Sequence, residues 1–548
     1  MGKRKKKQRG ELPDSPRRPL PTHKLDDVLQ RYIWWVVLSL VLVGGLCSLL
    51  VFDPNLDTNG DNARYIILGM SLAQGKGLSR ICMPGAPPEI MAPFGYPLLL
   101  TPFLALFPDN YLVLKLLSTL LFLLSLPLLF LIIKGRVESL LLALGVAALS
   151  AINLSLLDFG HQVMTEIPFL FFSLLGIFAI QRSLNCDGPR MTPKGRTLFG
   201  LSILALVFAY YIRSIGVVLL VALVSFLILR KRHRLALLAG LVILCLVIPW
   251  ILRNQAVADG PDYLDIFVLK NAYNPALGKI TAGDMLTRIK SNLNTYAIFV
   301  IPQALFPSLS PSAGYRGSLG LFYVLGLTAT LITLLGFIIR ARRSSGFLEL
   351  YIFFFLGACL LWPQMWSGMR FLIPVVPFMT YYFLVGLLVL ARKLGSKLSL
   401  LWGKSLIWLI VILMIASSLS GLAWASGRLK GYPAQWQNYF LVADWCREHT
   451  PQESIFVARK PWLFYLRARR LVMNYPYTAD VEEMISFMAT NQVDYVILDG
   501  FSWTGTTARY LWPAVAAHRD NFQAVYGLDN PKTWVLKTVG FAHQKEVE

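Results

Sequence analysis

Runs of apolar residues as long as a membrane-spanning helix constrain this chain more than any other feature of its sequence. The hydrocarbon core of a bilayer is about 30 Å thick, so a helix needs roughly 20 apolar residues to cross it. The first run lies at 32–52 and follows a polar, basic tail at 1–31. Ten more runs lie at 111–133, 138–157, 166–181, 197–212, 215–229, 235–252, 317–339, 347–363, 371–391 and 405–427. The sequence therefore predicts a polytopic α-helical membrane protein with about eleven spans.

The composition excludes a soluble globular protein. Of the 548 residues, 55% are hydrophobic and 15% are charged, against roughly 25% charged residues in an ordinary soluble domain. A net charge of +22 would suggest nucleic acid as the partner of a soluble protein, but in a membrane protein it indicates cytoplasmic loops. We therefore expect no nucleic-acid partner. Six cysteines are no disulfide framework, and whether Cys82 and Cys446, the two in outer segments, form a bridge is left open.

Lysine and arginine are distributed unevenly between the two sets of loops. If the tail at 1–31 is cytoplasmic, the inner segments hold 27 of these residues and the outer segments between spans hold 11. Because basic residues concentrate in short cytoplasmic loops, the asymmetry favours an N-in, C-out orientation. Three long segments, 53–110, 253–316 and 428–548, then face outside. The short inner loops and sparse glycosylation sequons favour a bacterial plasma (inner) membrane, with the working site on its outer face.

The segment 428–548 is polar and differs from the transmembrane part at 32–427. Its short periodic patterns predict helices at 436–449, 481–491 and 507–517, and strands at 454–458, 494–498, 522–526 and 534–537. Alternating helices and strands indicate a small extracytoplasmic α/β domain. Because it contains no phosphate loop, metal-ligand spacing or nucleophile motif, we expect a role in recognition or scaffolding.

The first outer loop carries several carboxylates, of which Asp61 is the most informative. The others are Asp53, Asp57, Glu89 and Asp109. Apolar residues at helical spacing predict a helix over 62–74 that lies on the outer membrane surface and is ended by Gly75 and Gly77. At the start of this helix, Asp61 could accept a proton from an arriving hydroxyl or could cap the helix, and the pattern leaves both alternatives open.

Three stretches carry a family resemblance: DNARYIILGMSLAQGKGLS at 61–79, PFGYPLLLTPFLALF at 93–107 and KLLS at 115–118. Together they resemble the GT-C glycosyltransferases, in particular the protein O-mannosyltransferase and aminoarabinose-transferase-like branch (glycosyltransferase family 39-like). The resemblance implies a GT-C fold, a polyprenyl-phosphate-linked sugar donor and a catalytic acidic residue in this loop. That residue corresponds to Asp61, with Asp57 second. Many of these enzymes have Asp-Glu where this chain has Asp61-Asn62, which weakens the case for a metal.

A second acidic element, LLDFGHQVMTEIPFLFF, lies between the third and fourth spans. Glu166 begins the fourth span, where a carboxylate would stabilise the positive end of the helix dipole, and this alone could explain it. Ionisable groups at the membrane edge of a bundle nevertheless tend to mark functional sites. The same family has a "tExPxxF" element here that lines the catalytic cavity. The resemblance therefore implies a catalytic or orienting role for Glu166, with His161 as its neighbour.

A lipid-phosphate donor requires cations at the membrane edge, because the departing phosphate gains charge. Four candidates for substrate binding face the outside: Arg370, Arg213, Arg253 and Lys270. Arg370 is favoured because it begins a span, because Pro374 and Pro377 would kink that span, and because the family has an "RYxxPxxP"-like element here. Snorkelling to the interface is the structural alternative for Arg370, and for Arg213 and Arg253 it is the favoured one.

The sequence thus suggests a hexosyl- or pentosyltransferase. It would move a sugar from a polyprenyl-phosphate donor to a hydroxyl of a lipid, glycan or protein acceptor, with inversion, on the outer face. Asp61 and Glu166 are the only candidates for a divalent cation, whose need stays open. The rival is a transporter or flippase of lipid-linked sugars. Against it, the spans contain almost no charged residues apart from Lys115 and Glu349, and the sequence shows no internal repeat.

Overall fold

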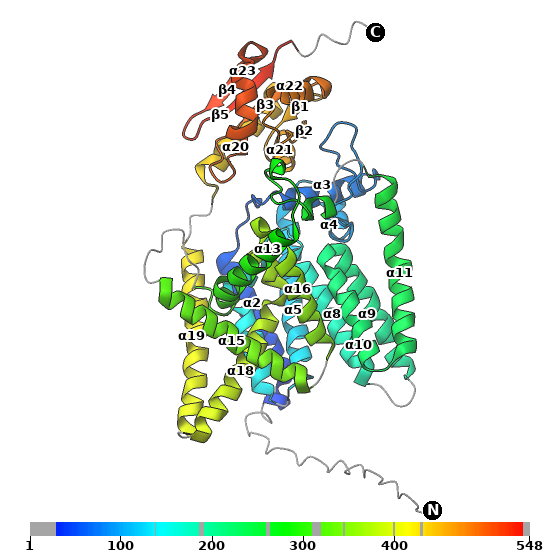
Figure 1. Ribbon diagram of the computed structural model, residues 1–548, viewed down its shortest axis with the longest axis vertical. Coiled ribbons are helices and arrows are strands. Elements are labelled where there is room, and N and C mark those ends of the chain that lie inside the picture. The colour runs from blue at the N-terminus through cyan, green and yellow to red at the C-terminus, as the bar shows by residue number, and fades with distance from the viewer. Residues whose placement is uncertain are drawn as a thin grey trace, which may run out of the picture.

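The computed structural model has two parts, a bundle of long helices and a small α/β domain at one end of it (Figure 1). It describes residues 29–137, 139–185, 191–258, 263–308, 319–343, 346–397, 400–427 and 431–540. The basic tail at 1–31, whose cytoplasmic location was predicted, lies almost entirely outside the described residues. The last bundle helix ends at Ser426, and the domain boundary expected near residue 428 stays a prediction.

Every apolar run predicted as a span forms a helix. These helices are α2 (Ile33–Val51), α5 (Tyr111–Lys134), α6 (Leu140–Ala151) with α7 (Leu154–Gly160), α8 (Glu166–Asn185), α9 (Pro193–Ile212), α10 (Val217–Leu229), α11 (His233–Ala256), α15 (Leu319–Arg343), α16 (Phe347–Leu361), α18 (Val376–Lys397) and α19 (Leu400–Ser426). Among the described residues, eight helices are long and apolar enough to cross a membrane, or nine if α6 and α7, which meet at 56°, form one span. The helices α10 and α16 are shorter, so the count of eleven stays a prediction.

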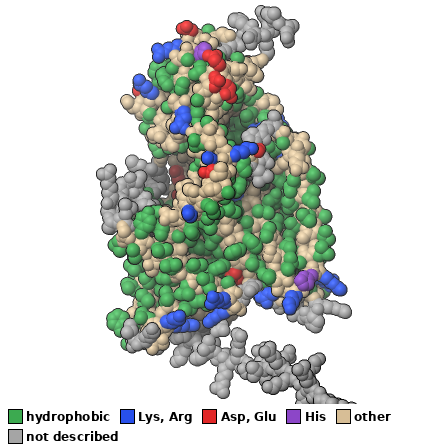
Figure 2. Space-filling view, viewed as in Figure 1, with side chains coloured by type: hydrophobic (Ala, Val, Ile, Leu, Met, Phe, Trp, Pro, Cys, Tyr) green, Lys and Arg blue, Asp and Glu red, His purple; other side chains and the backbone are tan. Residues whose placement is uncertain are grey.

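The charged side chains of the bundle are unevenly placed. Figure 2 shows lysine and arginine gathered at the end opposite the α/β domain, with a belt of hydrophobic side chains above them. This distribution agrees with basic loops on one side of a membrane, although the N-in, C-out orientation itself stays a prediction.

The α/β domain contains a five-stranded sheet of order β2-β1-β3-β5-β4. Its strands are β1 (Ile455–Val457), β2 (Leu471–Met473), β3 (Tyr495–Leu498), β4 (Phe522–Leu528) and β5 (Thr533–Thr538). The first three are parallel, and β5 is antiparallel to both β3 and β4. Its helices are α20 (Ala434–His449), α21 (Pro461–Ala468), α22 (Val481–Thr490) and α23 (Trp512–Ala517). All predicted elements are confirmed, with a π-helical turn leading into α23, whereas β2 and α21 were not predicted.

The first outer loop folds into α3 (Asp61–Ala73) and α4 (Gly95–Leu106). Gly75 and Gly77, both with positive φ, follow α3 as predicted. The expectation that α3 lies on the membrane surface stays a prediction, but its apolar face does not rest on lipid. Its apolar side chains Ile66 and Ile67 are fully buried, because α4 and α21 of the α/β domain cover them. The helical period correctly predicted an apolar face, but an apolar face packs equally well on lipid or on protein.

The other long outer segment and the start of the last-but-one span form short elements. They are α12 (Tyr263–Phe267), α13 (Ala282–Asn294), the π-helix Thr295–Val300, α14 (Ile301–Leu305), a 3-10 turn at Gln364–Trp366, α17 (Met369–Leu372) and a 3-10 turn at Ile373–Val375. The turn that contains Pro374 separates α17 from α18, but Met369–Ser396 still forms one continuous span, so the kink expected after Arg370 stays a prediction.

Two glycines allow α15 and α18 to cross with their backbones in contact. A Cβ atom on Gly336 would lie 1.9 Å from the Tyr382 carbonyl oxygen, and one on Gly386 would lie 2.1 Å from that of Ile332. The hydrophobic effect contributes little between helices in lipid, so dense van der Waals packing at such close contacts stabilises the helix pair.

We expect Gly386→Leu to destabilise the bundle by about 1–3 kcal/mol or more, because its side chain forces the two helices apart. Thermal unfolding of the purified protein in detergent measures the effect. Gly145→Leu is the matched control, because a Cβ there meets nothing within 4 Å. Equal unfolding temperatures for the two variants would contradict the packing account.

Candidate functional site

Arg370 bridges two carboxylates at the end of the bundle that faces the α/β domain. Its Nη2 lies 2.7 Å from Asp61 Oδ2, and its Nε lies 2.6 Å from Glu166 Oε1. The three residues come from α17, α3 and α8. The structure therefore brings together the two carboxylates and the arginine that the sequence analysis named as candidates for catalysis and for phosphate binding.

Local backbone features place each of the three side chains. Gly60, with φ of 95°, turns the chain into α3, so that Asp61 is the first helical residue. Glu166 likewise begins α8, and each carboxylate benefits from the positive end of its helix dipole. No capping hydrogen bond from a side chain is formed at the start of α3. Capping therefore does not explain Asp61.

Arg213 is the second cation at Glu166. Its Nη1 lies 2.7 Å from Glu166 Oε1, and its guanidinium lies over the Phe371 ring, 5.0 Å from the centroid. Glu166 is fully buried, and a buried carboxylate is tolerated only when cations or hydrogen bonds compensate it. Its other oxygen, Oε2, is also buried and has no hydrogen-bond partner among the described residues.

The Asp61 side of the site is open to solvent. The Asp61 side chain is 45% exposed and that of Arg370 is 31% exposed, whereas that of Glu166 is 0% exposed. Removal from water acts to raise the pKa of Asp61, but the adjacent Arg370 outweighs it and holds this pKa below its usual value. Asp61 is thus an ionised, accessible carboxylate, and Glu166 is an enclosed one.

Lys460 of the α/β domain also reaches this site. Its Nζ donates a hydrogen bond to the Asn59 carbonyl oxygen at 2.9 Å and lies 4.8 Å from the centroid of the Trp503 ring. Burial, together with the charges of Arg459 and Arg370, lowers the pKa of Lys460 to about 8, while Asp61 acts in the opposite direction. Sequence reasoning missed Lys460 because nothing local to it indicates contact with a loop 401 residues earlier.

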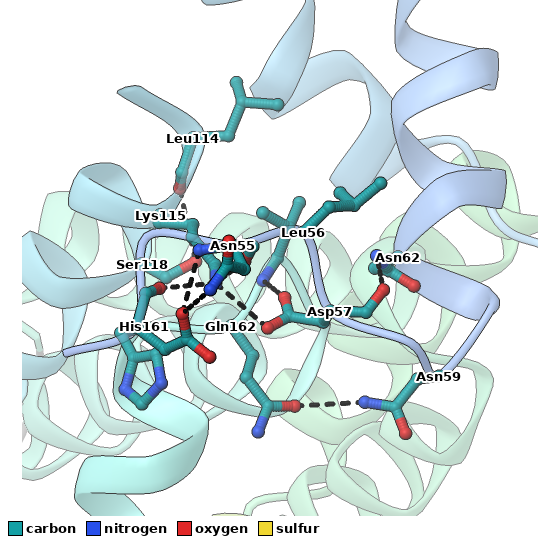
Figure 3. Close-up of polar contacts among 12 residues, drawn as sticks. Asn55, Leu56, Asp57, Asn59, Asn62, Leu114, Lys115, Ser118, His161 and Gln162 are labelled. Atoms are coloured by element: carbon teal, nitrogen blue, oxygen red, sulfur yellow. Dashed lines mark hydrogen bonds and ion pairs between the residues drawn. The ribbon is translucent and has the colours of Figure 1, made fainter. Parts of the chain in front are cut away.

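A second polar cluster, around Lys115, holds the loop that leads to Asp61 (Figure 3). The fully buried Lys115 lies 3.0 Å from Asp57 Oδ1 and donates hydrogen bonds to the carbonyl oxygens of Asp53 and Asn55. Asp57 Oδ2 accepts a hydrogen bond from the Val163 amide at 3.1 Å. Burial raises the pKa of Asp57, and Lys115 opposes this. The cluster joins the first outer loop to α5 and to the start of the α8 region.

Two other predicted site residues, Asp57 and His161, lie in this cluster or next to it. Asp57 is engaged with Lys115 and does not contact Arg370 in the described contacts. His161 lies beside the cluster (Figure 3), with Nδ1 3.1 Å from the Leu157 carbonyl oxygen and its ring 5.6 Å from that of Phe52. Both residues therefore have structural partners next to the site.

Arg253 and Lys270 lie elsewhere. Arg253 donates hydrogen bonds to the Glu89 carbonyl oxygen and to Asn254 Oδ1, which fastens the end of α11 to the first outer loop. Lys270 is partly exposed and pairs with Asp284 at 3.2 Å. The structure does not bring these two cations to the Arg370 site.

The open question of a bridge between Cys82 and Cys446 is answered by the structure, in which both are buried and free. The Cys82 carbonyl oxygen instead accepts a hydrogen bond from the Val472 amide at 2.7 Å. In the part of the chain that the structure describes, no group of three or more His, Cys, Asp or Glu residues could hold a metal ion. Asp61 and Glu166, the two carboxylates that the sequence suggested as metal ligands, are both paired with the Arg370 guanidinium.

Solved structures with the same fold are GT-C glycosyltransferases. The oligosaccharyltransferase of Archaeoglobus fulgidus, tethered to an acceptor peptide with the NVT sequon, matches with a TM-score of 0.59 and 13% identity over 94% of this chain and 75% of that chain. The same enzyme, AglB, with an inhibitory peptide and a dolichol-phosphate gives 0.57 and 12%, with the same coverage. ArnT from Cupriavidus metallidurans bound to undecaprenyl phosphate gives 0.53 and 14% over 93% of this chain and 99% of that chain.

The expected GT-C fold, with its C-terminal sheet domain, is thereby confirmed. No family model and no curated protein sequence matches the chain.

We expect Lys115→Met to destabilise the protein by about 3–5 kcal/mol, because it leaves the buried Asp57 carboxylate without its cation. Denaturation of the purified protein gives the change in stability. The double variant Lys115→Met/Asp57→Asn removes both charges and is expected to recover most of the loss. A double variant as unstable as the single one would show that the charge pair is not what holds this loop.

Proposed function

We propose that the chain is a membrane glycosyltransferase that moves a sugar from a polyprenyl-phosphate donor to an acceptor hydroxyl, with inversion at the anomeric carbon. The observation that carries the proposal is the bridge from Arg370 to Asp61 and Glu166, in a GT-C fold, at the bundle end next to the α/β domain. One neighbour is bound to undecaprenyl phosphate and another to a dolichol-phosphate, which supports a lipid-linked donor.

Arg370 is the contact for the donor phosphate. Its Nε and Nη2 carry the two ion pairs, so Nη1 is the nitrogen that an arriving phosphate would meet first. An arginine suits a departing phosphate, because it offers several donors and keeps its charge. As the bond between the sugar and the phosphate breaks, the phosphate keeps the electron pair and the guanidinium stabilises the new charge.

Asp61 is the base. It is ionised and exposed, so an acceptor hydroxyl from the water side can donate its proton to the carboxylate while the hydroxyl oxygen attacks the anomeric carbon. A phosphate that draws Arg370 away would raise the basicity of Asp61 when the donor is bound. Glu166 pairs with Arg213 and Arg370 and orients the Arg370 guanidinium toward the donor phosphate.

A divalent cation does not fit this arrangement of the site. Asp61 and Glu166 could hold one together only if Arg370 left both carboxylates. One structure of the archaeal enzyme contains Zn and sulfate, but we assign no step to a metal in this chain. Activity in the presence of EDTA, followed by added Mn²⁺, tests this assignment directly.

We place the protein in a bacterial plasma membrane, with the site on the extracytoplasmic side. The concentration of lysine and arginine at the opposite end of the bundle supports this orientation (Figure 2). Screening of donor and acceptor substrates identifies the sugar and decides whether the acceptor is a lipid, a glycan or a protein. The rival function, transport of lipid-linked sugars, receives less support because the charged groups of the site lie at one end of the bundle and not at mid-membrane.

The proposal is tested by incubating the protein in lipid with a panel of polyprenyl-phosphate sugars and a cell-envelope extract. We expect Asp61→Asn to lower sugar transfer by about 10²–10⁴-fold, because the base is lost. Asp444→Asn is the matched control, since Asp444 also pairs with an arginine, Arg467, at 2.9 Å. If neither wild type nor variant transfers sugar, and wild type moves lipid-linked sugar between leaflets, the transporter function replaces the enzyme.

The pH dependence of transfer tests whether the reaction needs the positive charge of Lys460, which holds the chain before Asp61 through the Asn59 carbonyl oxygen. Because its pKa is lowered to about 8, its positive charge is lost as the pH rises through that value, and we expect activity to fall there. Lys460→Arg keeps the charge at high pH and is expected to move this decline upward by at least one pH unit. Identical alkaline limits for wild type and Lys460→Arg would exclude Lys460 as the titrating group.

A further inference from the structure

A large cavity lies between α9 and α11, far from the Arg370 site. It has a volume of about 1270 Å³. Since α9 ends next to Arg213, which pairs with Glu166, the other end of this 20-residue helix lies about 30 Å away. The cavity begins at that distant end, and the proposed transfer reaction does not use it.

The mouth of the cavity is basic. Its basic lining residues are Arg196, Lys231, Arg232, His233 and Arg234, and the described residues that line it include no aspartate or glutamate. Lys231 and Arg232 lie in the tight turn between α10 and α11, where Lys231 has a φ of 56°, and His233 and Arg234 are the first two residues of α11. Placing like charges so close together is unfavourable, and a bound anion would relieve the repulsion.

The inner part of the cavity is apolar. Its walls continue along both helices from the basic mouth, through Gly200 and Leu204 on α9 and through Leu238 and Val242 on α11. Leu204 is 55% exposed and Leu238 is 52% exposed. From Arg196 to Leu204, and from Arg234 to Val242, each wall rises about 12 Å along its helix. A basic mouth that leads into an apolar groove of this length matches a charged headgroup followed by an acyl chain.

The basic lining extends beyond this cavity. A neighbouring cavity of about 760 Å³ shares Arg232 with it and is lined by five further basic residues, Lys134, Arg136, Arg182, Arg230 and Arg340. Figure 2 shows lysine, arginine and histidine side chains together at this end of the molecule, near the lower end of α11. Basic residues in loops are enough to set the orientation of a membrane protein. That role does not explain why these residues line cavities.

We propose that the groove between α9 and α11 is a binding site for an anionic phospholipid of the leaflet opposite the α/β domain. The headgroup phosphate contacts Lys231, Arg232 and Arg234, and one acyl chain lies along the apolar walls. Basic pockets between transmembrane helices bind anionic headgroups in this way. The bound lipid fills the space beside α11, which packs loosely at the edge of the bundle (Figure 1), and therefore stabilises that helix.

The test compares lipids with identical acyl chains and different headgroups. Delipidated protein in detergent receives dioleoyl phosphatidylglycerol, dioleoyl phosphatidylcholine or inorganic phosphate, and native mass spectrometry counts the bound molecules. We expect at least tenfold higher occupancy for phosphatidylglycerol than for phosphatidylcholine. Equal occupancy of the two lipids would overturn the proposal. Competition by millimolar inorganic phosphate that removes all bound lipid would also overturn it, since it would identify a site for a soluble anion.

Two variants separate the headgroup contact from the groove. The triple variant Lys231→Gln/Arg232→Gln/Arg234→Gln is expected to lose the preference for phosphatidylglycerol. Gly200→Leu is expected to lower occupancy about tenfold with every charge intact, because a Cβ there meets nothing within 4 Å and the side chain can fill the groove.

Each variant has a matched control. Arg342→Gln/Arg343→Gln/Arg392→Gln removes three exposed charges that do not line this groove, and Gly145→Leu adds a leucine in open space on α6. Both controls are expected to retain the lipid. Equal loss in the controls would mean that net charge or surface area, and not this groove, determines binding. The transfer assay with Asp61→Asn reports on the other end of the bundle, so failure of one proposal is distinguishable from failure of the other.

Discussion

The arginine that joins Asp61 to Glu166 is the interaction on which the functional end of the molecule depends. Two carboxylates this close to one another, one of them fully buried, repel unless a cation lies between them. Arg370 supplies that cation, and Arg213 adds a second one on the buried side. The two arginines balance the charges of the two carboxylates, and Lys460 adds a further positive charge below a pH of about 8.

The rest of the outer end holds these charges in place. Lys115 anchors the start of the first outer loop from inside the bundle, and the α/β domain closes over α3 from outside. Tyr432 donates a hydrogen bond to the Leu56 carbonyl oxygen at 2.9 Å, and Lys460 donates one to that of Asn59. The domain expected to serve recognition or scaffolding thus contacts the chain on both sides of Asp57, directly before the proposed base.

Much of this arrangement could be predicted from the sequence, because it rests on local patterns. Apolar length marked the bundle helices, Pro374 marked the turn beside Arg370, and Glu166 marked the start of α8. What could not be predicted depends on distant partners. An amphipathic pattern does not say whether α3 packs on lipid or on protein. The sequence around Arg253 likewise does not reveal that its guanidinium donates a hydrogen bond to a backbone carbonyl oxygen of the first outer loop. Lys460 depends on the docking of a whole domain.

The most direct test of the account is an experimental structure of the protein with a bound polyprenyl phosphate. The account predicts that the phosphate contacts the guanidinium of Arg370, and that the ion pair with Asp61, now 2.7 Å long, lengthens or opens while Glu166 keeps Arg213. A phosphate bound away from Arg370, with the bridge between Asp61 and Glu166 unchanged, would contradict it.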